Sequence, residues 1–174
     1  LDKSNRNKLF KLNKKINGKL NLSSDKIYSK YNLVNSFESR LNFINGNILV
    51  EQLLFNLGKL GAADITGVIK NTDNRSNFKF EKNIFVDNEK YFFNKFGVFN
   101  RENKASSLYI SGSFDFKKLH MRLNEISSDK KFHDNETNYI ETEFNNILLE
   151  DDYNSLFNFL LLKKFIKKTF NELN

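Results

Sequence analysis

The sequence predicts a mainly β protein: a curved antiparallel β-meander with a groove-like apolar face, a C-terminal amphipathic α-helix and a short N-terminal helix. Three observations support this fold class. Apolar and polar residues alternate through much of residues 18–150, as is typical of strands with one buried face. Five of the seven glycines stand two residues before an apolar residue at such a segment. After Glu150 the apolar period lengthens from two residues to that of a helix.

Residues 1–17 are predicted to form a lead-in helix or a linker. Leu9, Leu12 and Ile16 recur at helical spacing in "NRNKLFKLNKKING", and a helix there would end before Gly18. The chain starts with Leu rather than Met, so we expect it to be part of a longer protein. It contains no signal peptide and no apolar run long enough to span a bilayer.

The meander is expected over residues 18–150, with about eight strands of five or six residues. Alternation is clear in "GKLNLSS", "ESRLNFING", "NFKFEKNIFV" and "LYISGSFDFKKLHMRL". A further strand is predicted in "NYIETEFNNILL", through Ile140, Thr142 and Phe144. The recurring glycine pattern indicates a chain that turns or kinks at glycine and then enters a strand. These glycines are Gly18, Gly46, Gly67, Gly97 and Gly112.

The stretch "NLGKLGAADITGVIK" contains three glycines and raises the question of a phosphate-binding loop. A P-loop needs Lys and then Ser or Thr directly after its last glycine, whereas Gly67 is followed by Val68 and Ile69. A dinucleotide-binding fingerprint opens a helix, whereas "ADITGVIK" alternates as a strand. We therefore predict a glycine hairpin between the strands "NILVEQLLFNL" and "AADITGVI".

Residues 151–174 are predicted to form a helix docked on the same domain. Asp151 or Asp152 would cap its N-terminus, and apolar residues then fall on one face at helical spacing. Four lysines gather on the opposite face, where they would contact an anionic membrane surface at ~1 kcal/mol each, or form the solvated back of the docked helix. These lysines are Lys163, Lys164, Lys167 and Lys168.

No catalytic residue, metal site or cofactor motif is recognisable in the sequence, so we do not predict an enzyme. His120 and His133 are 13 residues apart with no patterned carboxylate nearby. The carboxylates of "SDKKFHDNETNYIETEF" are explained by a loop and those of "EDD" by a helix cap. Cysteine is absent, which excludes disulfides and thiolate metal sites. The net charge of +7 favours anionic partners, or reflects a lysine-rich solvated surface.

Several motifs between residues 9 and 70 occur in a characteristic order. A strand with alternating leucines opens at Gly18, the next strand ends at Asn45 and Gly46, and "GNILVEQLLFNL" follows. A turn with Gly58 or Gly61 and a strand closing on Gly67 complete the series, and "SSLYISGSFDFKKLHMRLNEIS" repeats it more loosely. In this order of motifs the chain resembles the AsmA-like family of bacterial envelope proteins.

The resemblance implies a periplasmic protein that is anchored in the inner membrane by an N-terminal helix missing from this chain. It also implies a long curled sheet whose apolar groove conducts the acyl chains of phospholipids, or of another anionic lipid, between membranes. No cofactor is implied. The alternating side chains expected to line the groove are Leu20, Leu22, Leu41, Phe43, Phe78, Phe80, Phe114 and Phe116.

Two other functional classes remain open from the sequence. One is a non-enzymatic β-structured interaction module of a surface or phage protein, and the other is a basic nucleic-acid-binding domain. Lysines interleaved with aromatic residues in "NKLFKLNKK" suit the second class, but any strand with one solvated face has the same pattern. The sequence also leaves open which of Ile48, Leu49 and Val50 faces the groove, because apolar residues there occupy both parities.

Overall fold

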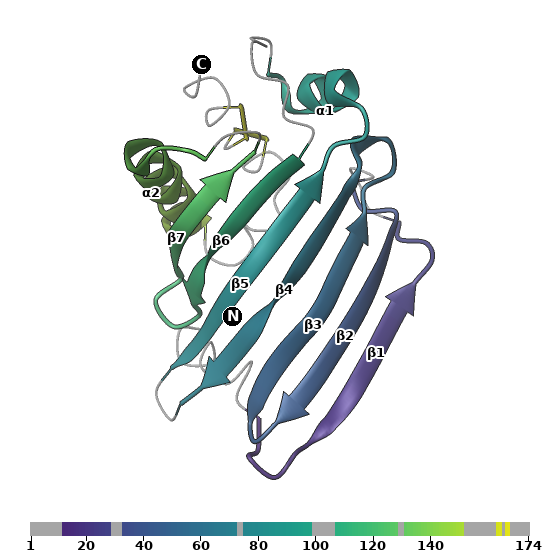
Figure 1. The fold of residues 1–174 in the computed structure, drawn as a ribbon, viewed down its shortest axis with the longest axis vertical. Coiled ribbons are helices and arrows are strands. Elements are labelled where there is room, and N and C mark those ends of the chain that lie inside the picture. The colour runs from purple at the N-terminus through teal and green to yellow at the C-terminus, as the bar shows by residue number, and fades with distance from the viewer. Residues whose placement is uncertain are drawn as a thin grey trace.

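The structure is a computed structural model that describes residues 12–28, 33–72, 75–98, 107–128, 131–151, 163–164 and 166–167. Its centre is one seven-stranded antiparallel sheet in which the strands follow the order of the chain (Figure 1). This confirms the predicted β-meander. The strands are β1 (Gly18–Ser24), β2 (Ser36–Ile44), β3 (Asn47–Asn56), β4 (Ala62–Asn71), β5 (Ser76–Phe85), β6 (Ser107–Asp115) and β7 (His120–Ser127).

The register places most of the apolar strand residues on one side of the sheet, here called the apolar face. Paired residues form four rows across the strands. The first row contains Gly18, Phe43, Ile48, Ile69, Phe78, Phe114 and Met121, and the second contains Leu20, Leu41, Val50, Gly67, Phe80, Gly112 and Leu123. The third row contains Leu22, Ser39, Leu53, Ile65, Lys82, Ile110 and Ile126, and the fourth contains Ser24, Phe37, Phe55, Ala63, Ile84 and Leu108.

A β-bulge in β3 explains why apolar residues of this strand occupy both parities. Ile48 and Val50 pair with Phe43 and Leu41, and the register then shifts before Leu53. The extra residue returns the strand to the same side, because one inserted residue reverses the alternation that follows it. Ile48 and Val50 therefore lie on the apolar face, and Leu49 on the opposite, polar face.

The prediction of a further strand in "NYIETEFNNILL" is wrong. Residues 134–151 instead form the helix α2 (Asp134–Asp151). Its buried residues, Thr137, Ile140 and Asn145, recur at helical spacing. The backbone N–H of His133 donates to Glu136 Oε2 at 2.7 Å, as in a capping box. The change from strand to helix thus occurs before Asp134 and not near Glu150.

The predicted C-terminal helix from about Asp152 to Leu173 lies mostly outside the described residues. Within the described part, residues 163–164 and 166–167 are helical, and Ile166 packs against an apolar cluster described below. The predicted domain boundary at residue 151 consequently falls at the end of α2.

The described part of the predicted lead-in helix is not helical. Residues 12–17 contain a turn at Lys14 and Lys15, in which the N–H of Lys15 donates to Asn13 Oδ1 at 2.9 Å. Leu12 packs against the apolar face, so helical spacing in this segment does not reflect a helix surface. Residues 1–11, including Leu9, lie outside the described residues.

A short helix that the sequence did not predict, α1 (Glu89–Phe96), connects β5 to β6. The side chain of Asn88 caps its first turn by accepting from the N–H of Tyr91 at 2.8 Å, and Gly97 ends it. Three phenylalanines of α1 pack against Leu60 and Val98 and are buried there. These five residues are here called the α1 cluster. Its phenylalanines are Phe92, Phe93 and Phe96.

The prediction that the chain turns or kinks at each of the five glycines and then enters a strand is therefore correct at only some of them. Gly18 opens β1, and Gly46 lies in the two-residue turn before β3. Gly97 instead ends α1, while Gly67 and Gly112 lie inside β4 and β6. The segment predicted as one alternating strand around Phe114 is divided into β6 and β7 by a turn over residues 116–119.

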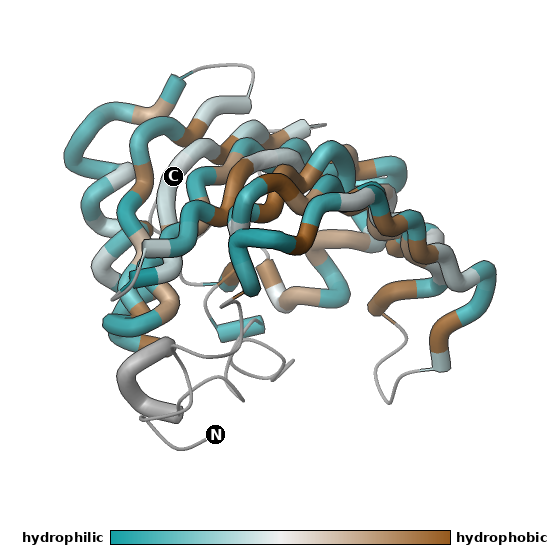
Figure 2. The backbone as a smooth tube through the Cα atoms, turned by 90° about the horizontal axis from the view of Figure 1, so that it is seen from below, coloured by the Kyte–Doolittle hydropathy of each residue, from teal (hydrophilic) through white to brown (hydrophobic). Residues whose placement is uncertain are grey.

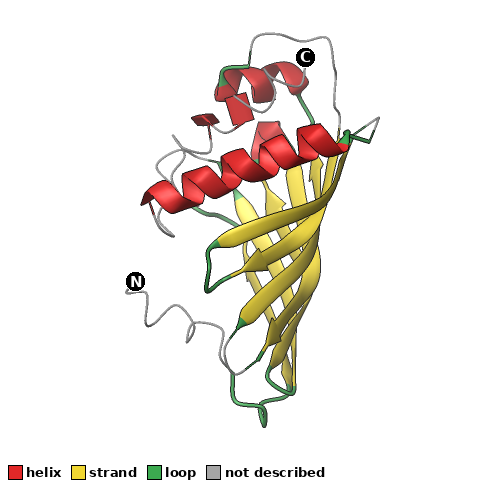
Figure 3. Ribbon diagram, turned by 90° about the vertical axis from the view of Figure 1, so that its left-hand side faces the viewer, coloured by secondary structure: helices red, strands yellow, loops and turns green. Residues whose placement is uncertain are grey.

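Helix α2 lies along the outer edge of β7 and covers the neighbouring part of the apolar face (Figure 3). The side chain of Asn145 accepts from the N–H of Met121 and donates to its carbonyl oxygen, both at 2.8 Å. Glu141 Oε2 accepts from the N–H of Leu123 at 2.7 Å. These side chains satisfy backbone groups that an edge strand would otherwise leave unpaired.

Replacing Asn145 by alanine is expected to lower the free energy of unfolding by about 1–3 kcal/mol, because two backbone groups of Met121 lose their partners in a partly buried position. Urea denaturation would measure the change. Asn138, an exposed asparagine of the same helix, supplies the control, and Asn138→Ala should stay within about 0.5 kcal/mol of the parent. Equal effects of the two changes would show that α2 does not protect the β7 edge.

Candidate functional site

The eight predicted groove residues lie together, although they do not form a uniformly open surface. Phe116 lies in the turn after β6 and packs against the apolar face. The other seven share the apolar face, which is the parity that the sequence predicted. They are Leu20, Leu22, Leu41, Phe43, Phe78, Phe80 and Phe114.

The first two rows of the apolar face are packed in the middle of the sheet. Phe80 and Phe114 are only 9% and 6% exposed, in a cluster that also receives Phe144 from α2. A second cluster forms around Ile48, Val50 and Ile69, and here Leu12 contributes from outside the sheet. Phe80 and Phe114 therefore belong to the core and not to a binding surface.

On the first two strands, by contrast, the predicted groove residues are more exposed. Leu20 and Leu22 of β1 are 38% and 47% exposed, and Leu41 and Phe43 of β2 are half-buried. Alternation identified all of these residues equally well, because it reports the side of a strand on which a residue lies. It does not report which part of that side another element covers.

The third and fourth rows form a second region that the sequence reasoning missed, here called the apolar lane. It lies between the packed first two rows and the α1 cluster, against which Leu57 and Val86 pack directly after the ends of β3 and β5. Figure 2 shows the curved sheet and the alternating hydropathy of its strands. Three residues of these two rows, Ser39, Ala63 and Ile126, are buried. The half-buried apolar side chains of the lane are Phe37, Leu53, Phe55, Ile65, Ile84, Leu108 and Ile110.

One charged residue interrupts this lane. Lys82 of β5 pairs with Ile65 of β4 and with Ile110 of β6 in the third row. The residue is half-buried, and burial lowers the pKa of its ammonium group below the usual value. Among the described strand residues, Lys82 is the only charged one in the four rows of the apolar face.

The glycine stretch forms the predicted hairpin between β3 and β4, with the 3-10 turn η2 (Gly58–Leu60) at its tip. Its amides are already engaged. Gly58 N–H donates to Asn56 Oδ1, Leu57 N–H to the carbonyl oxygen of Gly61, and Gly61 N–H to that of Gly58. A phosphate-binding loop needs such amides directed at the ligand, so this hairpin lacks the required geometry.

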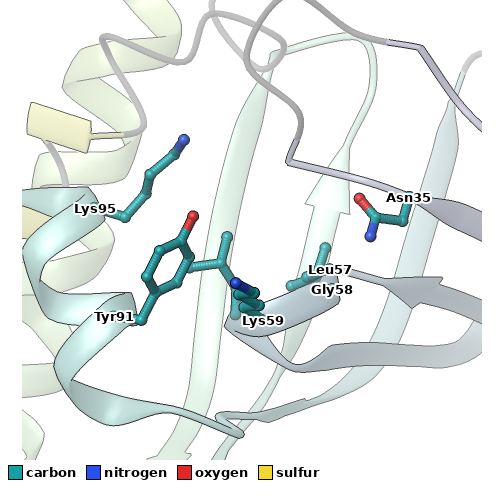
Figure 4. Close-up of a pocket in the computed structure, with 7 residues that line it drawn as sticks. Asn35, Leu57, Gly58, Lys59, Tyr91 and Lys95 are labelled. Carbon is teal, nitrogen blue, oxygen red and sulfur yellow. The ribbon is translucent and has the colours of Figure 1, made fainter.

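A small cavity of about 150 Å³ lies between this turn and α1 (Figure 4). Tyr91 and Lys95 project from α1, Lys59 belongs to η2, and Asn35 lies across from them. Most of the exposed lining is polar. The cavity therefore does not suit an acyl chain. Of its two lysines, Lys59 is exposed and Lys95 is half-buried.

The structure describes three of the four lysines predicted to contact a membrane. Lys163 is half-buried and lies beside Gly97, with its Cε 3.4 Å from the place where a Cβ of Gly97 would lie. A cation is favourable there because the C-terminal end of α1 carries partial negative charge. Lys164 and Lys167 are exposed, and Lys168 lies outside the described residues. Contact of these lysines with a membrane stays a prediction.

The remaining polar candidates have structural partners. His120 and His133 are both exposed, and His120 Nε2 lies 3.4 Å from Asn145 Nδ2. Glu136 and Glu141 accept from backbone amides. Within the described residues, no three His, Asp or Glu side chains are placed to hold a metal ion.

Comparison of the chain with protein-family models, with curated proteins and with solved structures finds no match. In the part of the chain that the structure describes, no helix combines the length and the apolar character needed to span a membrane.

Proposed function

We propose that this protein binds acyl chains of lipids on the apolar lane of its sheet. The observation that carries the proposal is the register, which aligns apolar side chains from β2 to β6 and leaves them only half-buried. Each methylene group transferred from water to such a surface contributes about 0.8 kcal/mol. Several buried methylenes thus supply useful affinity without a catalytic residue.

In this proposal the ligand is a phospholipid or another anionic lipid, and the protein conducts it between membranes in the periplasm of a bacterium. Support for the ligand class and the location comes from the resemblance of residues 9–70 to the AsmA-like family. Support for an entry point comes from β1, where the apolar face reaches the sheet edge with Leu20 and Leu22 exposed.

A second candidate function is that of an interaction module, and the free edge of β1 favours it. β1 is an outermost strand of the described sheet, and nearly all of its residues are exposed. An unpaired edge is a template to which a strand of another protein can add. The nucleic-acid alternative has less support, because acidic and basic residues such as Glu38, Arg40, Lys19 and Glu51 are interspersed on the polar face.

Crosslinking with a photoactivatable acyl chain tests the lipid proposal. Leu53 and Leu54 are adjacent half-buried leucines of β3, and the register directs Leu53 to the apolar lane and Leu54 to the polar face. We expect Leu53→Asp to reduce labelling at least about tenfold, because a carboxylate in the lane opposes burial of methylenes. Leu54→Asp should leave most of the labelling intact.

Native mass spectrometry after gentle purification supplies an independent measurement. Lipid binding predicts co-purified mass that is present in the parent protein and in the Leu54→Asp variant, and reduced in the Leu53→Asp variant. Circular dichroism would verify that both variants are folded. Absence of lipid mass and of crosslinking in the parent protein would reject the proposal and favour the interaction module.

A further inference from the structure

Lys82 occupies the place in the apolar lane where a hydrophobic residue is expected. It follows Phe78 and Phe80 and precedes Ile84 on the same side of β5, so its position is part of the apolar pattern. Lateral neighbours are Ile65 and Ile110. A cation in such a position loses hydration and is costly unless an anion compensates it.

The described part of the chain supplies no such anion. No hydrogen bond or ion pair joins Lys82 to another described residue; the ion pairs of the sheet region are Lys19 with Glu51 and Lys131 with Glu125. Glu81, its neighbour on β5, pairs at Thr66 on the polar side of the sheet. In α2, Glu141 is engaged by the amide of Leu123.

The lane extends from Lys82 toward the open edge of the sheet. Along the third row, Ile65 and Leu53 lead across β4 and β3, and the small, buried Ser39 of β2 separates them from Leu22 of β1. Four strand spacings amount to about 19 Å. This span compares with the ~15 Å that an acyl chain covers in one leaflet of a bilayer.

We propose that the lane binds a long-chain fatty acid, with its carboxylate paired to the ammonium group of Lys82 and its acyl chain directed toward β1. The inference rests on the acyl-chain function proposed above and specifies the ligand class. A single ammonium matches the single charge and small size of a carboxylate. The neighbouring Ile84, Ile65 and Ile110 offer apolar contacts and no further donor for a larger phosphate group.

The test compares a long-chain fatty acid with the fatty alcohol of the same chain length, which has no charge. Titration calorimetry on the whole chain should show about ten- to a hundredfold tighter binding of the acid, as expected for a hydrogen bond to a charged group. Lys82→Met keeps a long, unbranched side chain and removes the charge. It should remove the preference, so that the acid binds no tighter than the alcohol.

Lys79 lies on the same strand but on the polar face, where it is exposed, so Lys79→Met is the matched control and should keep the preference. Equal binding of acid and alcohol by the parent protein, or a preference that survives Lys82→Met, would overturn the role of Lys82 alone. Failure of both ligands to bind would overturn the acyl-chain function and, with it, this inference.

The melting temperature of the ligand-free protein distinguishes two sources of an anion for Lys82, an external ligand and another segment of the chain. If another segment of the chain supplied the anion, Lys82→Met would break an ion pair and lower the melting temperature. We expect the melting temperature to stay the same or rise, since an uncompensated half-buried charge is removed. A clear decrease would contradict the proposal.

Discussion

Replacing Phe92 by alanine is expected to lower the free energy of unfolding by about 3–5 kcal/mol, the cost of removing a large aromatic side chain from a core. Phe92 is 7% exposed, and its ring lies 5.6 Å from that of Phe93 and 4.8 Å from that of Phe96, measured between centroids. It also belongs to the cluster that joins α1 to Leu60 of the β3–β4 turn. Loss of this side chain therefore weakens helix, turn and sheet contacts together.

Tyr91 provides the control for this prediction. It is the neighbouring aromatic residue of α1 and is 44% exposed, so Tyr91→Ala should cost less than about 1 kcal/mol. Urea unfolding followed by circular dichroism measures both variants. Similar small losses for the two changes would show that the α1 cluster unfolds separately from the sheet and adds little to its stability.

The alternation of apolar residues predicted most of the sheet, because a strand with one buried face leaves a period of two in the sequence. It worked best in β1, β2 and β5, where the pairs Leu20 and Leu22, Leu41 and Phe43, and Phe78 and Phe80 alternate with polar or charged residues. In β3 the same rule gave no answer. A bulge between Val50 and Leu53 reverses the alternation, and its position depends on pairing with β2 and β4.

The alternation of apolar and polar residues gave a wrong prediction in α2, a helix that contains polar residues at every second position. Ile140, Thr142 and Phe144 follow a period of two, yet they belong to α2, and the contacts of this helix use Ile140, Glu141 and Asn145. Two of these contacting residues are polar and bind the backbone of β7. Ile140, Phe144 and Ile147 nevertheless also follow helical spacing, and Glu136 three residues after His133 was an available capping signal.

The candidate site was predictable in part. The parity of Phe78, Phe80 and Phe114 followed from sequence, but their burial depends on the turn after β6 and on Phe144 of α2. Lys82 was visible as well, since it has the parity of Phe78, Phe80 and Ile84 in "NFKFEKNIF". Its significance required the register, which shows that isoleucines flank it on both adjacent strands.

Gly67→Val is expected to lower the free energy of unfolding by about 3 kcal/mol or more, although valine is the better residue for a strand. Gly67 pairs with Phe80 in the second row, and Gly112 lies on the other side of Phe80. A Cβ at Gly67 would collide with the carbonyl oxygen of Lys79 and lie 2.9 Å from Cα of Phe80. Because these are backbone atoms of β5, no side-chain movement relieves the overlap.

Gly18→Val separates this close approach from a general effect of adding valine. No atom lies within 4 Å of a Cβ at Gly18, so this change should be neutral or slightly stabilising in urea unfolding. If Gly67→Val proved equally harmless, β4 and β5 could not lie as close as the structure has them. Saturable binding of ATP or NAD that Gly67→Val abolishes would contradict a structural role in another way. It would assign ligand chemistry to a glycine that, in this sheet, makes room for the backbone of β5.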